Sequence, residues 1–246
     1  MRVAVLADVH GNLTALRAVA AALETETLDG AVVAGDHLWG GPRPVEVWET
    51  LRRSGWVLVR GNEDEALARP APPPQPAGFR FGRAYAAHHA WARGLLGPGP
   101  LAELGALPFA ARLSTPAGDL LVVHASPRST TDRAGGPHNT DEEVAAAYAG
   151  TGASAIAFGH WHAAFVRPTP FALLVNAASV GLPNDHLPLA GYSVLTARPG
   201  GWTVEQRRVP YDAREEAAAA SARGLPPWLP DPELGQEPAT EGARAA

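Results

Sequence analysis

The sequence predicts an α/β fold, because short apolar runs of strand length alternate with segments of helical periodicity. Val3, Val5 and Leu6 form the first of these runs, and its β-branched, apolar composition is typical of a strand covered on both faces. Polar residues end this run and several later ones. In open α/β sheets ligands bind at the carboxyl ends of the strands, so these endings are the candidate functional positions.

Strands and helices alternate through the first quarter of the chain. Asn12 can cap a helix over residues 13–23, where the apolar positions follow the helical period. Residues 31–34 and 56–59 are predicted strands, and residues 44–53 are a predicted helix between them. The three strands end in Asp8-Val9-His10, Gly35-Asp36 and Gly61-Asn62-Glu63-Asp64. Because the carboxyl ends of parallel strands lie side by side, these polar groups are expected to converge.

Asp8 and His10 form the first candidate metal site. A carboxylate and an imidazole two residues apart on an extended segment point to the same side, so one cation can be held by both. The alternative is a turn aspartate followed by a capping histidine. Three successive strands with such endings favour the metal site, because one match arises by chance more easily than three.

The middle of the chain, residues 69–113, differs in character. Residues 69–78 are rich in proline and predict an extended loop, and residues 79–96 have helical spacing. Residues 101–107 predict a second short helix. We interpret this block as an inserted helical pair that overhangs the strand ends. The alternative is a packing hairpin without a catalytic role.

The second half resumes the pattern of strands with polar endings. Thr140 and Glu143 form a capping box at the start of a predicted helix over residues 141–148. The C-terminal residues 225–246 are rich in Pro, Glu, Gly and Ala, have little to bury, and are expected to be mobile. The remaining predicted elements are strands at 119–123 before His124, 155–158 before Gly159-His160-Trp161-His162 and 171–175 before Asn176, a hairpin of 191–196 with 202–209, and a helix at 212–223.

Composition excludes several classes of function. The chain has no cysteine, so any metal must be bound by oxygen and imidazole nitrogen. A net charge of -5 argues against a broad nucleic-acid surface, although the 20 basic residues are all arginine and leave room for a local patch. No run approaches the ~20 apolar residues of a membrane span, and the N-terminus carries no signal-peptide pattern. We therefore expect a cytoplasmic protein.

Taken in order, five motifs resemble the calcineurin-like metallophosphoesterase superfamily. That family shows D-x-H, G-D, G-N-x-D/E, H and G-H-x-H, and the resemblance extends from Val3 to about Tyr211. Asp8-Val9-His10-Gly11-Asn12 and the helical block resemble the small bacterial phosphodiesterase and diadenosine-tetraphosphatase-like branch in particular. The matching residues are Asp8-Val9-His10, Gly35-Asp36, Gly61-Asn62-Glu63-Asp64, His124 and Gly159-His160-Trp161-His162.

The resemblance implies a four-layer α-β-β-α sandwich, with two mixed β-sheets flanked by helices and a small helical insert. Residues 1–211 would form the metallophosphoesterase domain with the insert at 69–113, and residues 212–246 would form a C-terminal helix and tail. The implied centre holds two divalent transition-metal ions, with Mn expected first and Fe, Zn, Ni or Co as alternatives. One ion would be held by Asp8, His10 and His162, the other by Asn62, His124 and His160, with Asp36 bridging them.

The implied activity is hydrolysis of a phosphodiester or of a nucleotide-type phosphoanhydride by a metal-bridging hydroxide. The expected partner is a small phosphorylated substrate, with a nucleotide as one candidate, and the oligomeric state stays open. Asn12 and Arg128 are the candidate substrate contacts, the latter because a guanidinium can bind phosphate. For Arg128 the alternative is a solvated loop arginine.

The sequence also departs from the family at Glu63, where many relatives carry a histidine that protonates the leaving group. Glu63 can replace it only if its pKa is raised, while Asp64 can instead hydrogen-bond a ligand. We count Asp36, Glu63, Asp64 and His89 as catalytic candidates. Two alternatives remain: a non-catalytic metal-binding scaffold on this fold, as in the retromer subunit, and a protein phosphatase, which the missing histidine disfavours.

Two further positions are open to test. His88 and His89 are adjacent and cannot both face the core of one helix, so one is expected to pack and the other to be solvated. We predict that His89→Ala lowers activity without loss of metal, whereas unchanged kinetics would assign His89 to packing. Residues 176–181 read Asn-Ala-Ala-Ser-Val-Gly where relatives often have Asn-Pro-Gly-Ser-Val-Gly, so the turn must be made differently, with Asn176 and Ser179 in supporting roles.

Overall fold

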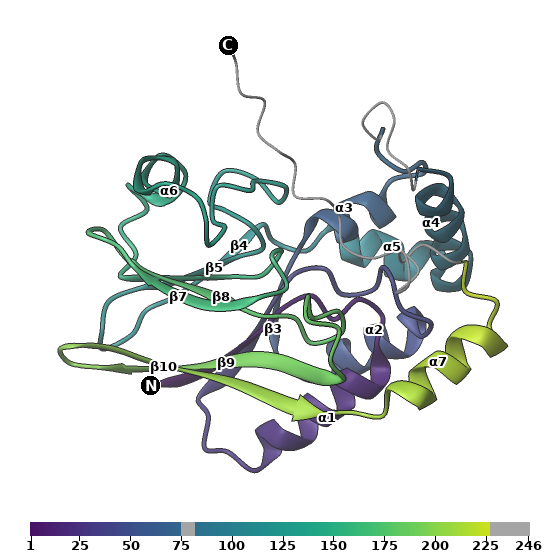
Figure 1. Ribbon diagram of the computed structural model, residues 1–246, viewed down its shortest axis with the longest axis horizontal. Helices are drawn as coiled ribbons and strands as arrows, with labels where there is room; N and C mark the ends of the chain where they lie inside the picture. Colours follow the sequence, from purple (N-terminus) through teal and green to yellow (C-terminus); the bar gives the residue numbers. More distant parts are fainter. Residues whose placement is uncertain (75–81, 227–246) are drawn as a thin grey trace.

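The computed structural model describes residues 1–74 and 82–226. Two five-stranded mixed sheets face each other, and helices lie on the outer side of each sheet (Figure 1). The four-layer sandwich is therefore confirmed. The first sheet has the strand order β10 (Gly201–Pro210), β9 (Leu189–Arg198), β1 (Arg2–Leu6), β2 (Gly30–Ala34) and β3 (Val57–Val59). The second has the order β4 (Ala110–Leu113), β5 (Leu120–Val123), β6 (Ala155–Phe158), β8 (Leu173–Ala177) and β7 (Ala164–Pro168).

Strand direction brings the polar endings together. β1, β2 and β3 run parallel, and so do β5, β6 and β8 in the other sheet. Their carboxyl ends lie at one edge of the sandwich, as the sequence predicts. The two long strands β9 and β10 pair antiparallel and attach to β1 from the C-terminal part of the chain.

Three apolar layers hold the sandwich together. Val5, Val32 and their neighbours on the inner face of the first sheet pack against Val122 and Val175 of the second. Alternate residues of the same strands, such as Leu6, point outward to the helices. Each central strand is thus buried on both faces, which explains its nearly continuous apolar composition.

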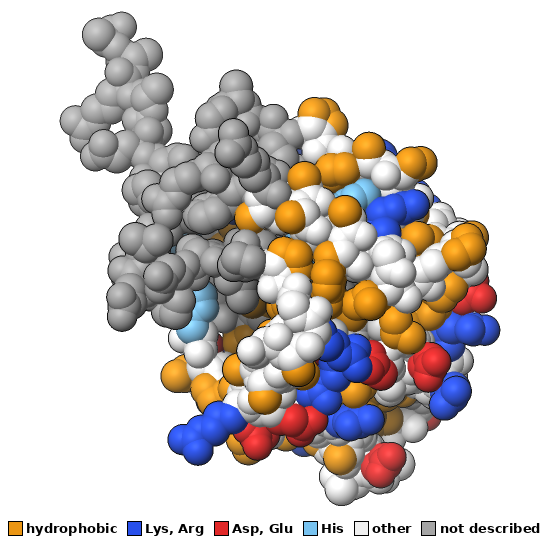
Figure 2. All heavy atoms as spheres, turned by 90° about the vertical axis from the view of Figure 1, so that its right-hand side faces the viewer, with side chains coloured by type: hydrophobic (Ala, Val, Ile, Leu, Met, Phe, Trp, Pro, Cys, Tyr) orange, Lys and Arg blue, Asp and Glu red, His pale blue; other side chains and the backbone are white. Residues whose placement is uncertain are grey.

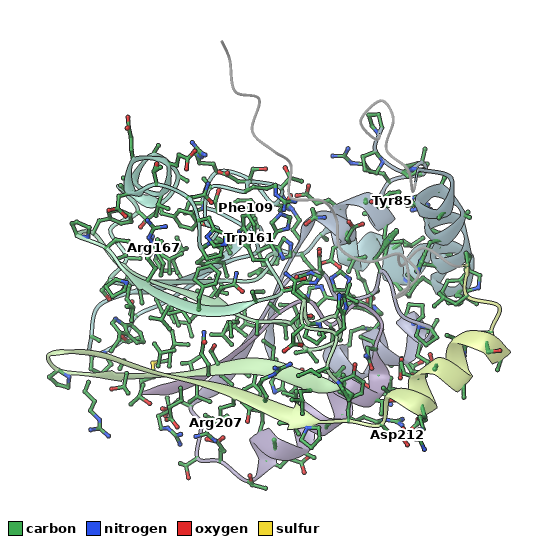
Figure 3. All side chains as sticks on the ribbon, in the orientation of Figure 1. Tyr85, Phe109, Trp161, Arg167, Arg207 and Asp212 are labelled. Carbon is green, nitrogen blue, oxygen red and sulfur yellow. The ribbon has the colours of Figure 1, made fainter. Side chains whose placement is uncertain are left out.

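The first sheet is covered by α1 (Leu13–Glu24) and α2 (Pro44–Arg53), as predicted. Asn12 caps α1 by accepting a hydrogen bond from the Ala15 amide. On the outer side of the second sheet lies α6 (Asp141–Tyr148), whose capping box from Thr140 and Glu143 is present. The C-terminal helix α7 (Ala213–Ala222) follows β10 and begins at Asp212, which is labelled in Figure 3.

The helical block after β3 is shorter than predicted. It contains α4 (Gly82–Leu96) and α5 (Pro98–Gly105), and residues 110–113 form β4 of the second sheet instead of the end of an insert. The segment 75–81, which includes part of the predicted loop and the predicted start of the helix, lies outside the described residues, as does 227–246 of the predicted tail.

Three elements were missed by the sequence analysis. They are α3 (Asn62–Ala68), β4 and β7. α3 begins inside the third motif, and its acidic first turn followed by Ala, Leu and Ala is a helix signal that reading the motif as a loop concealed. β4 and β7 are edge strands with partly exposed residues, so they lack the apolar runs that revealed the central strands.

The expectation for the two adjacent histidines was wrong. His88 and His89 are both buried, with 0% and 3% of their surface exposed. They can be, because α4 packs against two neighbours at once: the His88 ring lies on Trp39, and His89 Nε2 lies 2.9 Å from the Ala66 carbonyl of α3. Among the described residues, no helix is long and apolar enough to cross a membrane.

Candidate metal centre

The predicted ligand side chains converge at the carboxyl edge of the two sheets, but the backbone brings them there in an unexpected way. Asp8 and His10 have φ values of 54° and 50°, and His160 and His162 have 67° and 52°. These are left-handed conformations, so the premise of an extended Asp8–His10 segment was wrong. Such conformations cost about 1–2 kcal/mol per residue, which the surrounding hydrogen bonds must offset.

Two motif glycines are required by close packing at the centre. A Cβ on Gly61 would lie 2.1 Å from Oδ1 of Asp36, and a Cβ on Gly159 would lie 2.6 Å from Oδ2 of Asp8. Both distances are far below van der Waals contact. The glycines therefore allow one strand end to approach the carboxylate of another.

Asp8, His10 and His162 form the first donor group. Nε2 of His10 lies 3.1 Å from Nε2 of His162, and this second nitrogen lies 3.5 Å from Oδ1 of Asp8. One ligand atom from each of the three side chains lies within 4.8 Å of the others. Two imidazole nitrogens and a carboxylate oxygen directed at one point suit a transition-metal ion.

Asn62, His124 and His160 form the second donor group. Oδ1 of Asn62 lies 2.9 Å from Nε2 of His124 and 3.0 Å from Nδ1 of His160. The two nitrogens are 3.2 Å apart. This is the second ligand set that the resemblance implied.

Asp36 lies between the two groups. Its Oδ2 is 3.9 Å from Nε2 of His10 and 3.4 Å from Nε2 of His124. Its Oδ1 accepts a hydrogen bond of 2.8 Å from the Glu63 amide, which fixes the carboxylate plane. The carboxylate of Asp36 therefore lies near a ring nitrogen of each donor group.

Backbone carbonyls orient three of the imidazoles. Nδ1 of His10 lies 2.6 Å from the Trp39 oxygen, and Nδ1 of His124 and of His162 have carbonyl partners at 2.8 Å and 2.7 Å. A carbonyl only accepts, so each Nδ1 carries the hydrogen and each neutral ring presents the Nε2 lone pair to the centre. Lone pairs 3.1 Å apart, as between His10 and His162, repel unless a cation or a proton lies between them.

The charges of the centre favour bound cations. Burial lowers the pKa of His160 to about 4. Burial also acts to lower the pKa of His124, but Asp36, Asp8 and the Ala34 carbonyl together outweigh it and raise this pKa to about 10. Burial acts against the ionised form of Asp36, yet His124 keeps the pKa of this carboxyl below its usual value. Buried carboxylates thus draw positive charge onto the imidazoles, and divalent cations would supply that charge. The donor set therefore fits a pair of metal ions.

Asp64 supports the centre from behind. Its buried carboxylate accepts hydrogen bonds from the amides of Asp36, His37 and Gly61, at 2.8–3.0 Å, and lies 2.7 Å from Nδ1 of His37. All of these partners belong to the loops after β2 and β3. This arrangement favours a positioning role for Asp64 over direct proton transfer.

Glu63 faces the centre, and Tyr85 is a neighbour that the sequence analysis missed. The hydroxyl of Tyr85 on α4, a residue labelled in Figure 3, donates a hydrogen bond of 2.7 Å to Oε2 of Glu63. Asn62 Nδ2 donates one of 3.0 Å to Oε1. Burial raises the pKa of Glu63 to about 8, Asp36 acts in the same direction, and a bound cation would act against both. Helical periodicity could not show which face of α4 meets the centre.

The other candidates lie nearby with their polar groups engaged. His89 bonds to the Ala66 carbonyl, so the residue that the helical block brings to Glu63 is Tyr85. Arg128 donates from Nε and Nη2 to Asp132, at 2.9 Å and 2.7 Å. The guanidinium of Arg133, which the sequence analysis did not select, lies 4.9 Å from the Trp161 ring between the two histidines of the last motif.

Asn12, Asn176 and Ser179 act on the backbone of the centre. Asn12 Nδ2 donates to the Gly181 carbonyl while its Oδ1 caps α1. Asn176 Nδ2 donates to the Gly159 carbonyl, and Ser179 Oγ donates to the Asp8 carbonyl. Ala178 makes the turn with a φ of 70°, a conformation that glycine adopts more readily.

The fold and the donor groups define a protein with candidate metal ligands at the carboxyl edge of two stacked sheets. The model of the calcineurin-like phosphoesterase superfamily domain matches residues 1–199. The chain belongs to this superfamily of metal-dependent phosphoesterases, some members of which are non-catalytic.

Solved structures agree with this assignment. A metallophosphoesterase from Sphaerobacter thermophilus has 25% sequence identity and a TM-score of 0.71, with 92% of this chain and 95% of that chain covered. The hypothetical protein PH1004 from Pyrococcus horikoshii OT3 shares the fold, with 18% identity, a TM-score of 0.75 and coverage of 95% and 96%. A comparison with curated proteins gives no match.

Proposed function

We propose that this protein is a dinuclear-metal-dependent phosphoesterase that hydrolyses a phosphodiester or a nucleotide-type phosphoanhydride. The observation that carries the proposal is the position of Asp36, whose Oδ2 lies between a nitrogen of His10 and a nitrogen of His124. Imidazole, carboxylate and amide donors suit Mn²⁺ and its transition-metal neighbours, and we propose Mn²⁺. We further propose that the enzyme acts in the cytoplasm on a small phosphorylated substrate.

The residues of the chain position the reacting groups and provide a proton donor. When bound, two divalent cations would polarise the phosphoryl oxygens and acidify a water molecule. Asp36 lies between the two donor groups and would keep them at a fixed distance. The carboxylate of Asp64 accepts hydrogen bonds from the amides of Asp36 and Gly61 and so fixes the backbone there. Glu63 is the proposed proton donor to the leaving oxygen, with its carboxyl oriented by Tyr85.

Hydrolysis of bis-p-nitrophenyl phosphate with added Mn²⁺ tests this function. Wild-type protein should turn the diester over only with metal, and Asp36→Asn should lower kcat by at least about 100-fold because a bridging charge is lost. A panel of dinucleoside polyphosphates, cyclic nucleotides and simple diesters then identifies the substrate class. Two bound metal ions without turnover of any diester, monoester or dinucleoside polyphosphate would contradict the proposal and favour the scaffold.

The complete set of donor side chains favours the enzyme over the scaffold and the protein phosphatase. Six predicted ligands lie in two groups of three around the seventh, Asp36, and a carboxyl group occupies the position of the missing histidine. A scaffold has no use for the half-buried Glu63 carboxyl, which Tyr85 holds beside the predicted metal ligands. If the protein hydrolyses the diester but does not dephosphorylate a phosphorylated peptide, the phosphatase alternative is excluded.

A further inference from the structure

A pocket of about 280 Å³ lies beside the metal centre. The metal ligand His10 and the neighbouring Asn12 form part of one wall, and Tyr211 and helix α7 form another. Four residues of α7 line it at helical spacing, namely Ala213, Glu216, Ala217 and Ala220. Three of the four are alanines, so the helix presents a face of small side chains and leaves the space open.

Polar contacts hold α7 in this position. Arg43, at the start of α2, donates to the carboxylates of Glu215 and Glu216, and the Thr14 hydroxyl also donates to Glu216 at 2.6 Å. At the other end of the helix Arg223 pairs with Glu46 of α2. The face of the molecule in Figure 2 shows arginines beside acidic side chains, in keeping with these pairs. The pocket wall is therefore fixed to the helices that cover the first sheet.

The lining of the pocket predicts the chemistry of its ligand. None of the described lining residues is an arginine, and the carboxylate of Glu216 is paired with Arg43. A second phosphate group would meet this carboxylate and no guanidinium among the described lining residues. Most of the remaining lining side chains are apolar, including Leu182 and Leu187, so an uncharged and largely apolar group fits best.

The size of the pocket and the polarity of its lining restrict the ligand further. A cavity of about 150 Å³ holds a benzene molecule, so this pocket has room for a larger ring system. The side chains of Asn12 and His186 and the ring of Tyr211 also line the pocket. A flat ring with polar edges therefore fits this lining better than a plain alkyl chain.

On the basis of the proposed function, we propose that this pocket binds a nucleobase-sized heteroaromatic ring that is carried by the alcohol, such as a nucleoside sugar, esterified to the scissile phosphate. Because His10 belongs both to the first donor group and to the pocket wall, one substrate can place its phosphate at the metals and its ring against α7. α7 is then a specificity element of the enzyme.

Two diesters with the same leaving group test this inference: thymidine 5′-(p-nitrophenyl phosphate) and methyl p-nitrophenyl phosphate. Wild-type protein should show a kcat/KM at least about tenfold higher for the thymidine ester. Ala217→Trp fills the pocket and should reduce the preference to about twofold, because kcat/KM falls more for the thymidine ester than for the methyl ester. Ala218→Trp lies on the same helix outside the lining and should keep the wild-type preference. Equal effects of Ala217→Trp on both esters would overturn the inference.

Direct binding separates a failure of this inference from a failure of the proposed function. Saturation-transfer NMR on the metal-loaded protein should show adenosine binding to wild type and to Ala218→Trp, and loss of binding to Ala217→Trp. Adenosine binding without any diester hydrolysis would support the proposed ligand of the pocket and contradict the proposed phosphoesterase activity. Hydrolysis without adenosine binding, or binding of n-octanol in its place, would overturn the assignment of a heteroaromatic ligand.

Discussion

Glu63 stands where many relatives carry a histidine, and its surroundings indicate how a carboxyl group can take over that role. Tyr85 and Asn62 each donate to one of its oxygens, which leaves the carboxyl group in a fixed orientation beside the second donor group. Burial, with the carboxylate of Glu63 acting in the same direction, raises the pKa of Tyr85, so the phenol stays protonated and remains a donor. The sequence identified Glu63, but its partner on a distant helix required the fold.

At the residue scale, we predict that Glu63→Gln affects poor leaving groups selectively. Glutamine keeps the shape of the side chain but has no acidic proton. Hydrolysis of methyl phenyl phosphate should slow by about 100-fold or more, and that of methyl p-nitrophenyl phosphate by less than about tenfold, since p-nitrophenolate leaves without a proton. Glu65→Gln on the same helix, where the carboxylate pairs with Arg60, is the control. An equal loss on both substrates would remove Glu63 as proton donor.

Gly61 provides a second prediction at this scale. A Cβ there would lie 2.4 Å from the Asp36 amide nitrogen as well as close to its carboxylate, so Gly61→Ala must displace Asp36, the proposed bridging ligand. We expect a loss of about 2 kcal/mol in unfolding free energy and less than two Mn²⁺ per chain. At Gly30 an added Cβ meets nothing within 4 Å, so Gly30→Ala is the control for urea unfolding and metal content. Full metal content in Gly61→Ala would show that the contact is unimportant.

At the element scale, the packing of α4 on the sandwich makes stability depend on pH. His88 is fully buried against Trp39, and its Nε2 accepts a hydrogen bond of 3.2 Å from the Gly40 amide. Burial lowers its pKa from 6.5 to about 4, with His10 and His89 acting in the same direction. The unfolded chain therefore binds a proton between these values that the folded chain does not, so stability falls as pH drops from about 6.5 to about 4.

His88→Gln should remove this dependence while keeping an acceptor for the Gly40 amide. Urea unfolding of the metal-free proteins measures this effect. Between about pH 7 and about pH 5, the free energy of unfolding of the wild type should fall by about 2 kcal/mol more than that of the variant. The two proteins should have similar stability near neutral pH. Parallel pH profiles would show that His88 is not the titrating group.

Some helices and strands could be predicted from the sequence and others could not. Buried strands such as β1 and β6 were found because both faces are covered, and α1 and α6 were found from their caps. The edge strand β4 carries partly exposed residues, and whether it pairs with β5 or belongs to the helical block depends on contacts between distant residues. The burial of both His88 and His89 was missed for the same reason, since a helix between two partners has two buried faces.

At the scale of the whole molecule, the order of five motifs predicted the centre better than local geometry did. The seven ligands come together although five of them, Asp8, His10, Asp36, His160 and His162, have positive φ values that no spacing rule gives. The order of the strands could not be predicted from the sequence either, because β9 pairs with β1 although the two lie at opposite ends of the chain. Neither the pocket against α7 nor the contact between Tyr85 and Glu63 has a signal in the sequence.

The central claim is that the chain holds two metal ions that share Asp36. The most direct measurement is the Mn²⁺ content per chain of the loaded and desalted protein, with electron paramagnetic resonance of the same sample. Our account predicts two Mn²⁺ per chain with a spin-coupled signal, and loss of the coupling in Asp36→Asn. One Mn²⁺ per chain or none, or two without coupling in the wild type, would contradict it.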